Sequence, residues 1–184
     1  MNGSADSTGN FGDPTIGIVV PAFNEADRWN SGYWPDFLKF EITTWQFVND
    51  GSSDGTAASL DALQVCYPNV NVMHLPLNVG KAEAVRQGLL QLMSTGNVEW
   101  VGFMDADGAF HSDDVEELLT ISERQSRDTG AEALWSSRVA LSGRDIQRSM
   151  RRHYLGRIIA TSLSLGLVQI PYDTQSGLKL FRVT

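Results

Sequence analysis

Short apolar segments alternate with longer amphipathic segments along most of this chain. The clearest apolar segment is Trp100–Met104 (WVGFM), whose continuous run predicts a strand buried on both faces of a sheet. Similar runs predict four more strands, at Thr15–Val20, Thr44–Val48, Val70–Leu75 and Ala133–Trp135, and a short apolar segment follows at Leu178–Phe181. Pro21 is expected to end the first of these, because proline cannot donate a backbone hydrogen bond within a sheet.

The segments between these runs predict helices. The predicted helices lie around Trp34–Phe40, from Ser53 or Asp54 to Cys66, from Lys81 through Leu89, from Ser112 through Ile121, and from Asp145 to about Gly166. Strands that alternate with helices in this way indicate an α/β sandwich with a mainly parallel sheet.

The polar residues that could carry chemistry follow the ends of predicted strands. They are Asn24, Glu25, Asp50, Gly80, Lys81, Asp105 and Asp107. In open α/β sheets ligands bind at the carboxyl ends of the strands, so these residues are expected to meet at one edge. This convergence is stronger evidence for a binding site than any single motif.

Asp105 and Asp107 stand two residues apart, directly after the most apolar strand. Two carboxylates this close repel each other and need a cation. Oxygen ligands at this spacing suit Mg²⁺ or Mn²⁺, often shared with substrate phosphates. An Asp-X-Asp pair alone is a weak signal, because most such pairs are solvated turn residues.

Two further loops each allow two interpretations. Asn49–Thr56 is either a turn that caps the following helix or a loop whose first acidic side chain after the strand, Asp50, contacts a ligand. Gly80 would let the backbone approach a phosphate, and Lys81 would add positive charge. The sequence around them is not a Walker phosphate-binding loop, since Gly-X4-Gly-Lys-Ser/Thr is missing.

The charge of the chain is unevenly distributed. A length of 184 residues indicates one domain, and a net charge of -8 argues against a nucleic-acid partner. Six of the eleven arginines, however, lie between Arg138 and Arg157, where Asp145 is the only acid. This arginine cluster either contacts phosphate groups or forms a solvated helix face.

The remaining compositional features concern the termini and the location. Residues 1–13 are polar and rich in Gly, Ser and Asn, so we expect a disordered leader before a domain at 14–184. Cys66 is the only cysteine, which rules out an internal disulfide and indicates a reducing, cytoplasmic location; its helical context predicts a buried thiol. The apolar run at Ile158–Ile170 is too short to span a bilayer.

Several motifs, in this order, resemble family 2 glycosyltransferases of the GT-A fold. They are VVPAFNE (Val19–Glu25), VNDGSSDGT (Val48–Thr56), NVGKAEAVRQG (Asn78–Gly88) and MDADG (Met104–Gly108). SSR (Ser136–Arg138) and DTQSGLKLF (Asp173–Phe181) resemble the polyprenyl-phosphate glycosyltransferases in particular, such as the dolichyl-phosphate glucosyl- and mannosyltransferases.

The resemblance implies a three-layer αβα sandwich that binds a nucleotide-sugar of the UDP-glucose or GDP-mannose type. The donor-binding residues implied are Pro21, Ala22, Phe23, Glu25, Asp50, Gly80, Lys81, Asp105 and Ala106, and the catalytic ones are Asp107, Arg138 and Asp173. Asp107 would ligate Mg or Mn, and Asp105 would contact the ribose or metal-bound water. The family continues beyond the segment at Leu178–Phe181, so a C-terminally truncated domain is expected at Thr184.

The function implied is metal-dependent, inverting transfer of a hexose to a polyprenyl phosphate. Such an acceptor places the protein peripherally at the inner face of a membrane, where Arg138 and the arginine cluster would bring two anions together. Two alternatives stay open: transfer to a saccharide hydroxyl with Asp173 as base, and a non-catalytic nucleotide-sugar-binding module. The sequence indicates no oligomeric state.

Overall fold

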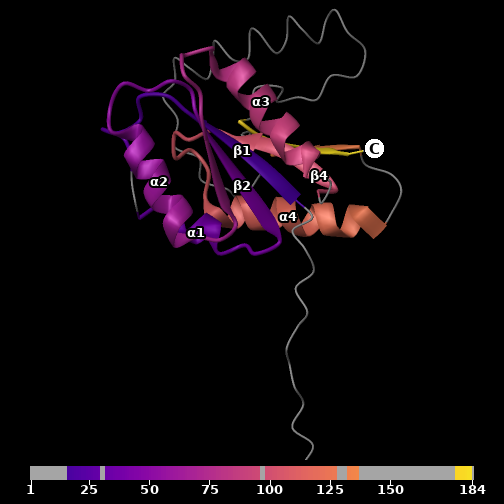
Figure 1. The fold of residues 1–184 in the computed structure, drawn as a ribbon. Coiled ribbons are helices and arrows are strands. Elements are labelled where there is room, and N and C mark those ends of the chain that lie inside the picture. The colour runs from indigo at the N-terminus through magenta and orange to yellow at the C-terminus, as the bar shows by residue number, and fades with distance from the viewer. Residues whose placement is uncertain (1–15, 30–31, 96–97, 128–131, 137–176, 184) are drawn as a thin grey trace, which may run out of the picture.

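The computed structural model describes residues 16–29, 32–95, 98–127, 132–136 and 177–183, and these form a six-stranded mixed sheet between helices (Figure 1). The strands are β1 (Ile16–Ala22), β2 (Thr43–Asn49), β3 (Val70–His74), β4 (Trp100–Met104), β5 (Ala133–Trp135) and β6 (Leu178–Arg182). Their order is β3-β2-β1-β4-β6-β5. The pairs β1–β2, β1–β4 and β2–β3 are parallel, and β6 runs antiparallel to both neighbours. The predicted α/β class with a mainly parallel sheet is confirmed.

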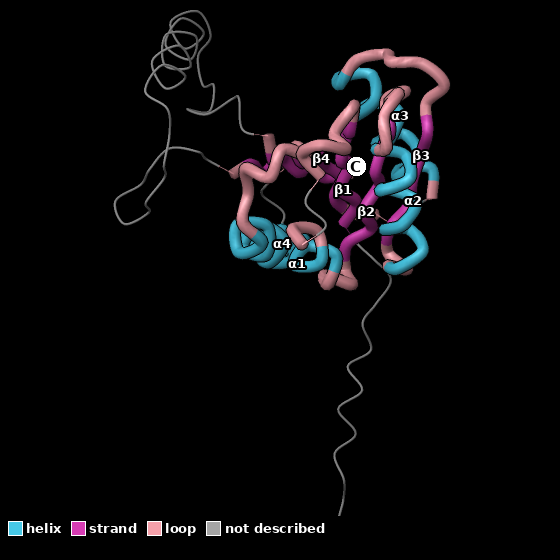
Figure 2. The backbone as a smooth tube through the Cα atoms, turned by 90° about the vertical axis from the view of Figure 1, so that its left-hand side faces the viewer, coloured by secondary structure: helices cyan, strands magenta, loops and turns pink. Residues whose placement is uncertain are grey.

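Helices cover both faces of this sheet and make three layers. The helices are α1 (Pro35–Leu38), α2 (Thr56–Cys66), α3 (Lys81–Ser94) and α4 (Ser112–Arg127). Ile16, Ile18 and Val20 point to the face that buries side chains of α1, α2 and α4, while Val19 points to the face covered by α3. Figures 1 and 2 show α3 on one side of the strands and α1 with α4 on the other. The alternation follows from the two-residue period of a strand.

An aromatic cluster holds α1 against the sheet. Trp34 and Phe37 are buried against Trp45 and Phe47 of β2, and the Trp29 ring stacks on Trp34 at 5.3 Å between centroids. Burying each such ring contributes roughly 1.5–3 kcal/mol. These aromatic residues thus belong to the core, and the helix expected around Trp34–Phe40 ends at Leu38.

The expectation that Pro21 ends the first strand is wrong. β1 continues through Pro21 to Ala22, and Pro21 is paired with Val48 of β2. The Ala22 carbonyl accepts a hydrogen bond from Asp50 N, so the backbone of Ala22 faces β2 and that of Pro21 faces the opposite side. On that side the pairing with β4 has already ended at Val19, so no ladder hydrogen bond is lost at Pro21.

Cys66 is exposed, which corrects the expected buried thiol. Leu60 and Leu63 are the residues that α2 buries against the sheet. The helix turns Val65 toward solvent, with 87 % of its surface exposed, and Cys66 ends the helix beside it. The helical pattern identified the element correctly but did not determine which residues face the core.

Several sequence predictions fall outside the described residues. They are the leader at 1–13, the helix expected from Asp145, the arginine cluster, and the side chains of Arg138 and Asp173. Among the helices that the structure does describe, none combines the length and the apolar character needed to cross a bilayer.

Candidate functional site at the carboxyl edge of the sheet

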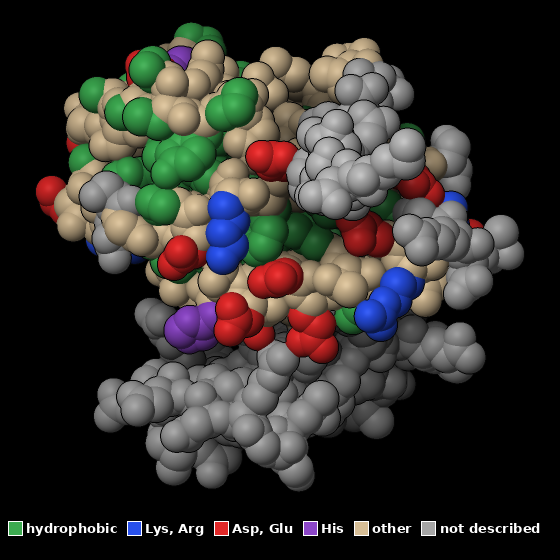
Figure 3. All heavy atoms as spheres, turned by 90° about the horizontal axis from the view of Figure 1, so that it is seen from below, with side chains coloured by type: hydrophobic (Ala, Val, Ile, Leu, Met, Phe, Trp, Pro, Cys, Tyr) green, Lys and Arg blue, Asp and Glu red, His purple; other side chains and the backbone are tan. Residues whose placement is uncertain are grey.

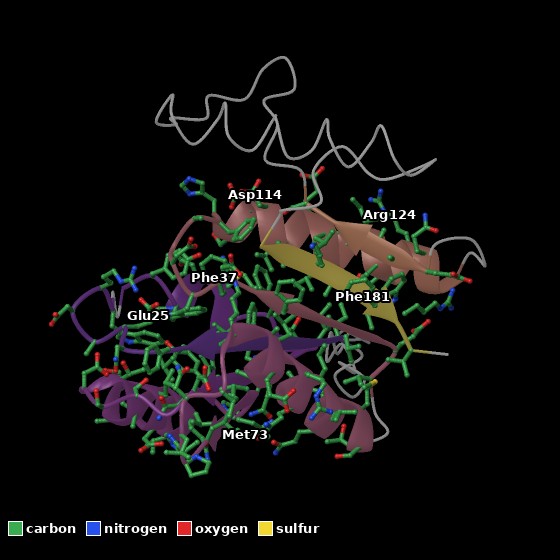
Figure 4. The ribbon with its side chains drawn as sticks, turned by 90° about the horizontal axis from the view of Figure 1, so that it is seen from above. Glu25, Phe37, Met73, Asp114, Arg124 and Phe181 are labelled. Atoms are coloured by element: carbon green, nitrogen blue, oxygen red, sulfur yellow. The ribbon has the colours of Figure 1, made fainter. Side chains whose placement is uncertain are left out.

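Four loops meet where β1, β2, β3 and β4 end, and each contains one residue in the left-handed backbone region. These residues are Asn24 (φ 50°), Gly51 (φ 65°), Gly80 (φ 90°) and Gly108 (φ 72°). Such residues let a chain reverse sharply after a strand. In Figure 4, Glu25 marks this end of the sheet, while Phe181 and Arg124 lie at the opposite end.

These loops enclose a cavity of about 250 Å³, which we call the edge cavity. Its lining residues are Pro21, Ala22, Phe23, Glu25, Asp50, Asn78, Gly80, Lys81, Asp105, Ala106 and Asp107. The structure thus brings together Asp107 and the nine residues expected to bind a nucleotide-sugar. Asn78 is the additional member, and its position in the motif that begins NVGK was the signal for it.

Asp50 organises the loop that follows β3. Only 2 % of its surface is exposed, and its carboxylate accepts hydrogen bonds from the backbone of Val79 (2.7 Å) and Gly80 (2.9 Å). The Asn78 amide adds a third donor at 3.1 Å. This arrangement agrees with the interpretation of Asp50 as a residue that stabilises a turn. Asp50 also lines the edge cavity. A contact with a nucleotide base stays a prediction.

Gly51 is required by the close approach of two loops. A Cβ added there would overlap the backbone of Leu77 and lie within 2.5 Å of the Asn78 nitrogen, and its φ of 65° disfavours other residues. We expect Gly51→Ala to lower the free energy of unfolding by at least about 2 kcal/mol, measured by denaturant titration.

Gly55→Ala is the matched control, since its Cβ would meet Ala26 at an ordinary 3.6 Å. Its stability should change by less than about 1 kcal/mol. Equal effects at both positions would mean that Leu77 and Asn78 do not pack against Gly51.

The loops after β1 and β2 are joined by side chains of the DGSSDGT segment. The Asn24 amide oxygen accepts from Ser53 N at 2.9 Å, and Ser52 Oγ accepts from Asn24 N at 3.0 Å. Asp54 Oδ2 accepts from Ala26 N at 3.1 Å, and hydrogen bonds led by that from the Thr56 hydroxyl lower the pKa of Asp54. Ser53 or Asp54 was expected to be the N-cap of α2, and this prediction is wrong, because Gly55 occupies that position. The polar side chains of Ser53 and Asp54 instead belong to the segment that holds the two loops together.

Asp105 is held from two directions. Its Oδ1 lies 2.6 Å from Lys81 Nζ, and its backbone N–H donates to the Gly177 carbonyl at 2.9 Å. A Cβ on Gly177 would overlap the Asp105 carboxylate. The glycine therefore allows the backbone that leads into β6 to pass directly against Asp105. The contact with Gly177 places the start of β6 directly beside a residue that lines the edge cavity.

Asp107 is exposed and its Oδ1 accepts from Ala109 N at 3.1 Å. Within the described ranges no group of three or more His, Cys, Asp or Glu could hold a metal ion. Asp105 and Asp107 nevertheless line one cavity, and Mg²⁺ is commonly bound by one or two carboxylates together with substrate phosphates. The two oxygen-bearing side chains therefore fit a cation shared with a diphosphate.

A second cavity, of about 220 Å³, adjoins the first and was not predicted from the sequence. It shares Glu25, Ala106 and Asp107 with the edge cavity and adds Arg28, Trp29, Tyr33, Trp34 and Gly108. The Tyr33 hydroxyl donates to the Phe110 carbonyl at 2.9 Å, and burial raises the pKa of Tyr33 above its usual value. The signal for this cavity was the aromatic segment after β1, from Trp29 to Trp34.

A ligand cavity at the carboxyl edge of a mainly parallel sheet, with paired carboxylates beside a lysine, defines an α/β ligand-binding protein. The family described as "Glycosyl transferase family 2" matches residues 36–159, more than half of the chain. The chain belongs to this family.

Curated relatives and a solved structure agree with this assignment. A dolichyl-phosphate beta-glucosyltransferase of Trichomonas vaginalis is 31 % identical over 180 residues, and that of Saccharomyces cerevisiae is 30 % identical over 187. Each match covers 90 % of this chain, and 52 % and 54 % of the respective relative. A mannosyltransferase from Pyrobaculum calidifontis, solved in complex with GDP-Man and Mn²⁺, aligns with a TM-score of 0.57 at 16 % identity, over 94 % of this chain and 45 % of its own.

These comparisons define how far the similarity extends. The fold is of the GT-A type, as the solved neighbour and the family match show. The chain spans about half the length of the curated relatives it matches.

Proposed function

We propose that this chain forms the donor-binding part of an inverting glycosyltransferase that moves a hexose from a nucleotide-sugar to a polyprenyl phosphate. The observation that supports this most is the edge cavity, where Asp107 and nine residues expected to bind the donor form one continuous wall. The relatives named as dolichyl-phosphate beta-glucosyltransferases support the class of acceptor. They also favour a glucose donor, whereas the mannosyltransferase neighbour was solved with GDP-Man.

The lining of the edge cavity offers groups that suit both the base and the phosphates of a nucleotide-sugar. Pro21, Phe23 and Asp50 offer an apolar wall and a carboxylate, which suit a planar base with ring N–H groups. In the same cavity α3 begins at Lys81, so its N-terminus and the lysine both favour a diphosphate. The residues therefore orient the donor with its phosphates beside Asp105 and Asp107.

Asp105 and Asp107 would hold a Mg²⁺ or Mn²⁺ ion shared with the donor. When bound, such an ion neutralises the charge that develops on the departing nucleoside diphosphate. Lys81 adds a positive charge beside Asp105. The chain's own contribution is thus to bind, orient and stabilise the leaving group.

The acceptor determines which further residue is needed. A polyprenyl phosphate is already an anion and needs no base, only cations that bring it to the donor, a role we assign to Arg138. A saccharide hydroxyl would need a carboxylate base, for which Asp173 is the candidate. Both residues lie outside the described residues.

A lipid acceptor requires the protein to approach a membrane peripherally. The face that carries α4 is unsuited to an anionic surface, because exposed Asp113, Glu116, Glu117 and Glu123 lie along that helix. Acidic side chains gather on this face in Figure 3. We assign the approach to the arginine cluster, in which each well-placed residue contributes about 1 kcal/mol at an anionic membrane.

The test is a transfer assay that offers UDP-glucose or GDP-mannose with either dolichyl phosphate or a soluble oligosaccharide. We expect labelled sugar in the lipid fraction, and Arg138→Ala should raise the KM for dolichyl phosphate while leaving nucleotide affinity within about twofold. Asp107→Ala serves as the inactive control. If labelled sugar is recovered on the oligosaccharide alone, the acceptor is a saccharide hydroxyl and not a lipid phosphate. Nucleotide binding without transfer would indicate a binding module.

A further inference from the structure

Lys81 is paired with a carboxylate that is also expected to serve the metal. Lys81 Nζ lies 2.6 Å from Asp105 Oδ1, and the side chains are 58 % and 23 % exposed. Among the residues that line the edge cavity, Lys81 has the one basic side chain. The next cation along α3, Arg86, is bound to Glu83 at 2.6 Å, and its hydrogen bonds lower the pKa of Glu83 to about 2.

The environment of Asp105 keeps its carboxylate beside Lys81. Gly177 lies against the Asp105 carboxylate from behind, and the backbone hydrogen bond from Asp105 to Gly177 fixes the start of the loop. An incoming divalent ion would therefore meet an ammonium group that already neutralises one of its two expected carboxylates. Two cations at this separation repel each other.

We propose that Lys81 serves as the counter-cation of Asp105 while the site holds no donor, and that the donor diphosphate draws Lys81 away and thereby opens Asp105 to the divalent ion. This inference rests on the proposed function and adds a coupling between its two ligands. Lys81 is here a positioning residue, because it acts on the metal through Asp105.

The chemistry of the pair makes such an exchange feasible. A half-exposed ion pair is weak in water, and the flexible four-carbon stem of a lysine lets its ammonium group change partners. A diphosphate offers more negative charge than one carboxylate. Since Lys81 begins α3, its side chain starts from the helix end at which phosphates are expected to bind.

The consequence is that nucleotide and metal bind cooperatively. If the nucleotide raises metal affinity by removing Lys81 from Asp105, then the metal must raise nucleotide affinity by the same factor. Without a nucleotide, the site should hold divalent ions weakly.

Binding of Mn²⁺ alone, followed by electron paramagnetic resonance of the free ion, tests this directly. We expect Lys81→Met to tighten Mn²⁺ binding about tenfold, and Lys81→Gln to do the same. Arg86→Met is the matched control: it removes one positive charge from the same helix but not from the cavity, so its Mn²⁺ affinity should stay within about twofold. With saturating UDP or GDP, and a correction for Mn²⁺ bound by free nucleotide, Mn²⁺ affinity should rise in both proteins, because the diphosphate itself is a ligand. The rise in wild type should be at least about fivefold greater than the rise in Lys81→Met.

The outcomes separate this inference from the proposed function. Suppose that Mn²⁺ and nucleotide bind wild type, but the Mn²⁺ affinity of Lys81→Met without nucleotide equals that of wild type or of Arg86→Met. The coupling role of Lys81 is then overturned, and the proposed donor site stands. If Mn²⁺ binds no variant, with or without nucleotide, both the coupling and the metal-dependent function fail.

Discussion

Replacing Asp107 by alanine should abolish the dependence of nucleotide binding on a divalent ion while leaving the fold intact. A bound nucleotide at one hundred times its dissociation constant stabilises wild type by about 2.7 kcal/mol, which thermal unfolding detects. In Asp107→Ala the stabilisation by UDP or GDP should be the same with and without Mn²⁺. The fold should survive because Asp107 is exposed and its side chain bonds to the backbone of Ala109 alone among the described contacts.

Asp113→Ala is the control for this experiment, since Asp113 is an exposed aspartate in the first turn of α4 and does not line the edge cavity. It should retain the full response to Mn²⁺. If Asp107→Ala also retains it, the assignment of Asp107 as a metal ligand is wrong.

Replacing Asp50 by alanine should have the largest effect on stability. The change leaves the N–H groups of Val79 and Gly80 without the acceptor that now binds both, in a position where Asp50 is almost fully buried. Each hydrogen bond to a charged acceptor contributes about 1.5–3 kcal/mol, so the free energy of unfolding should fall by about 3 kcal/mol in a denaturant titration. Asp27→Ala, at an exposed position in the neighbouring loop, should stay within about 0.5 kcal/mol.

The same variant tests the contact with the base. If Asp50 accepts a ring N–H of the nucleotide, Asp50→Ala weakens UDP or GDP far more than inorganic pyrophosphate. If the affinities for nucleotide and pyrophosphate fall equally, Asp50 does not contact the base, and its role is to stabilise the loop at Asn78–Gly80.

The sheet could be predicted because its strands are unusually apolar. Trp100–Met104 and the segment before Pro21 have few polar residues, so their burial follows from composition alone. The end of β1 could not be predicted from the sequence. Pro21 fits in the strand because β4 pairs with β1 only as far as Val19, so the missing N–H of the proline has no partner strand to bind. Which face of α2 carries Cys66 likewise depends on packing rather than on the helical period.

The candidate site could be located from the sequence but its interactions could not. The polar residues of the site follow strand ends, and this pattern alone predicts that Glu25, Asp50 and Asp105 meet at one edge of the sheet. The three residues do line one cavity. The pairing of Asp105 with Lys81, and of Asp50 with Val79, joins residues more than twenty positions apart. Such pairs depend on how the loops pack, and local patterns contain no information about them.

The place of β6 in the sheet has a consequence for synthesis of the protein. β6 is the last described strand in the chain, yet it is inserted between β4 and β5, and its first residue pairs with Met104. While the chain emerges from the ribosome, β1 to β4 are available long before β6, so one edge of β4 stays unpaired and Asp105 lacks Gly177 behind it. Nascent chains that end before Gly177 should therefore lack a formed site, and they expose a strand edge that a chaperone can recognise.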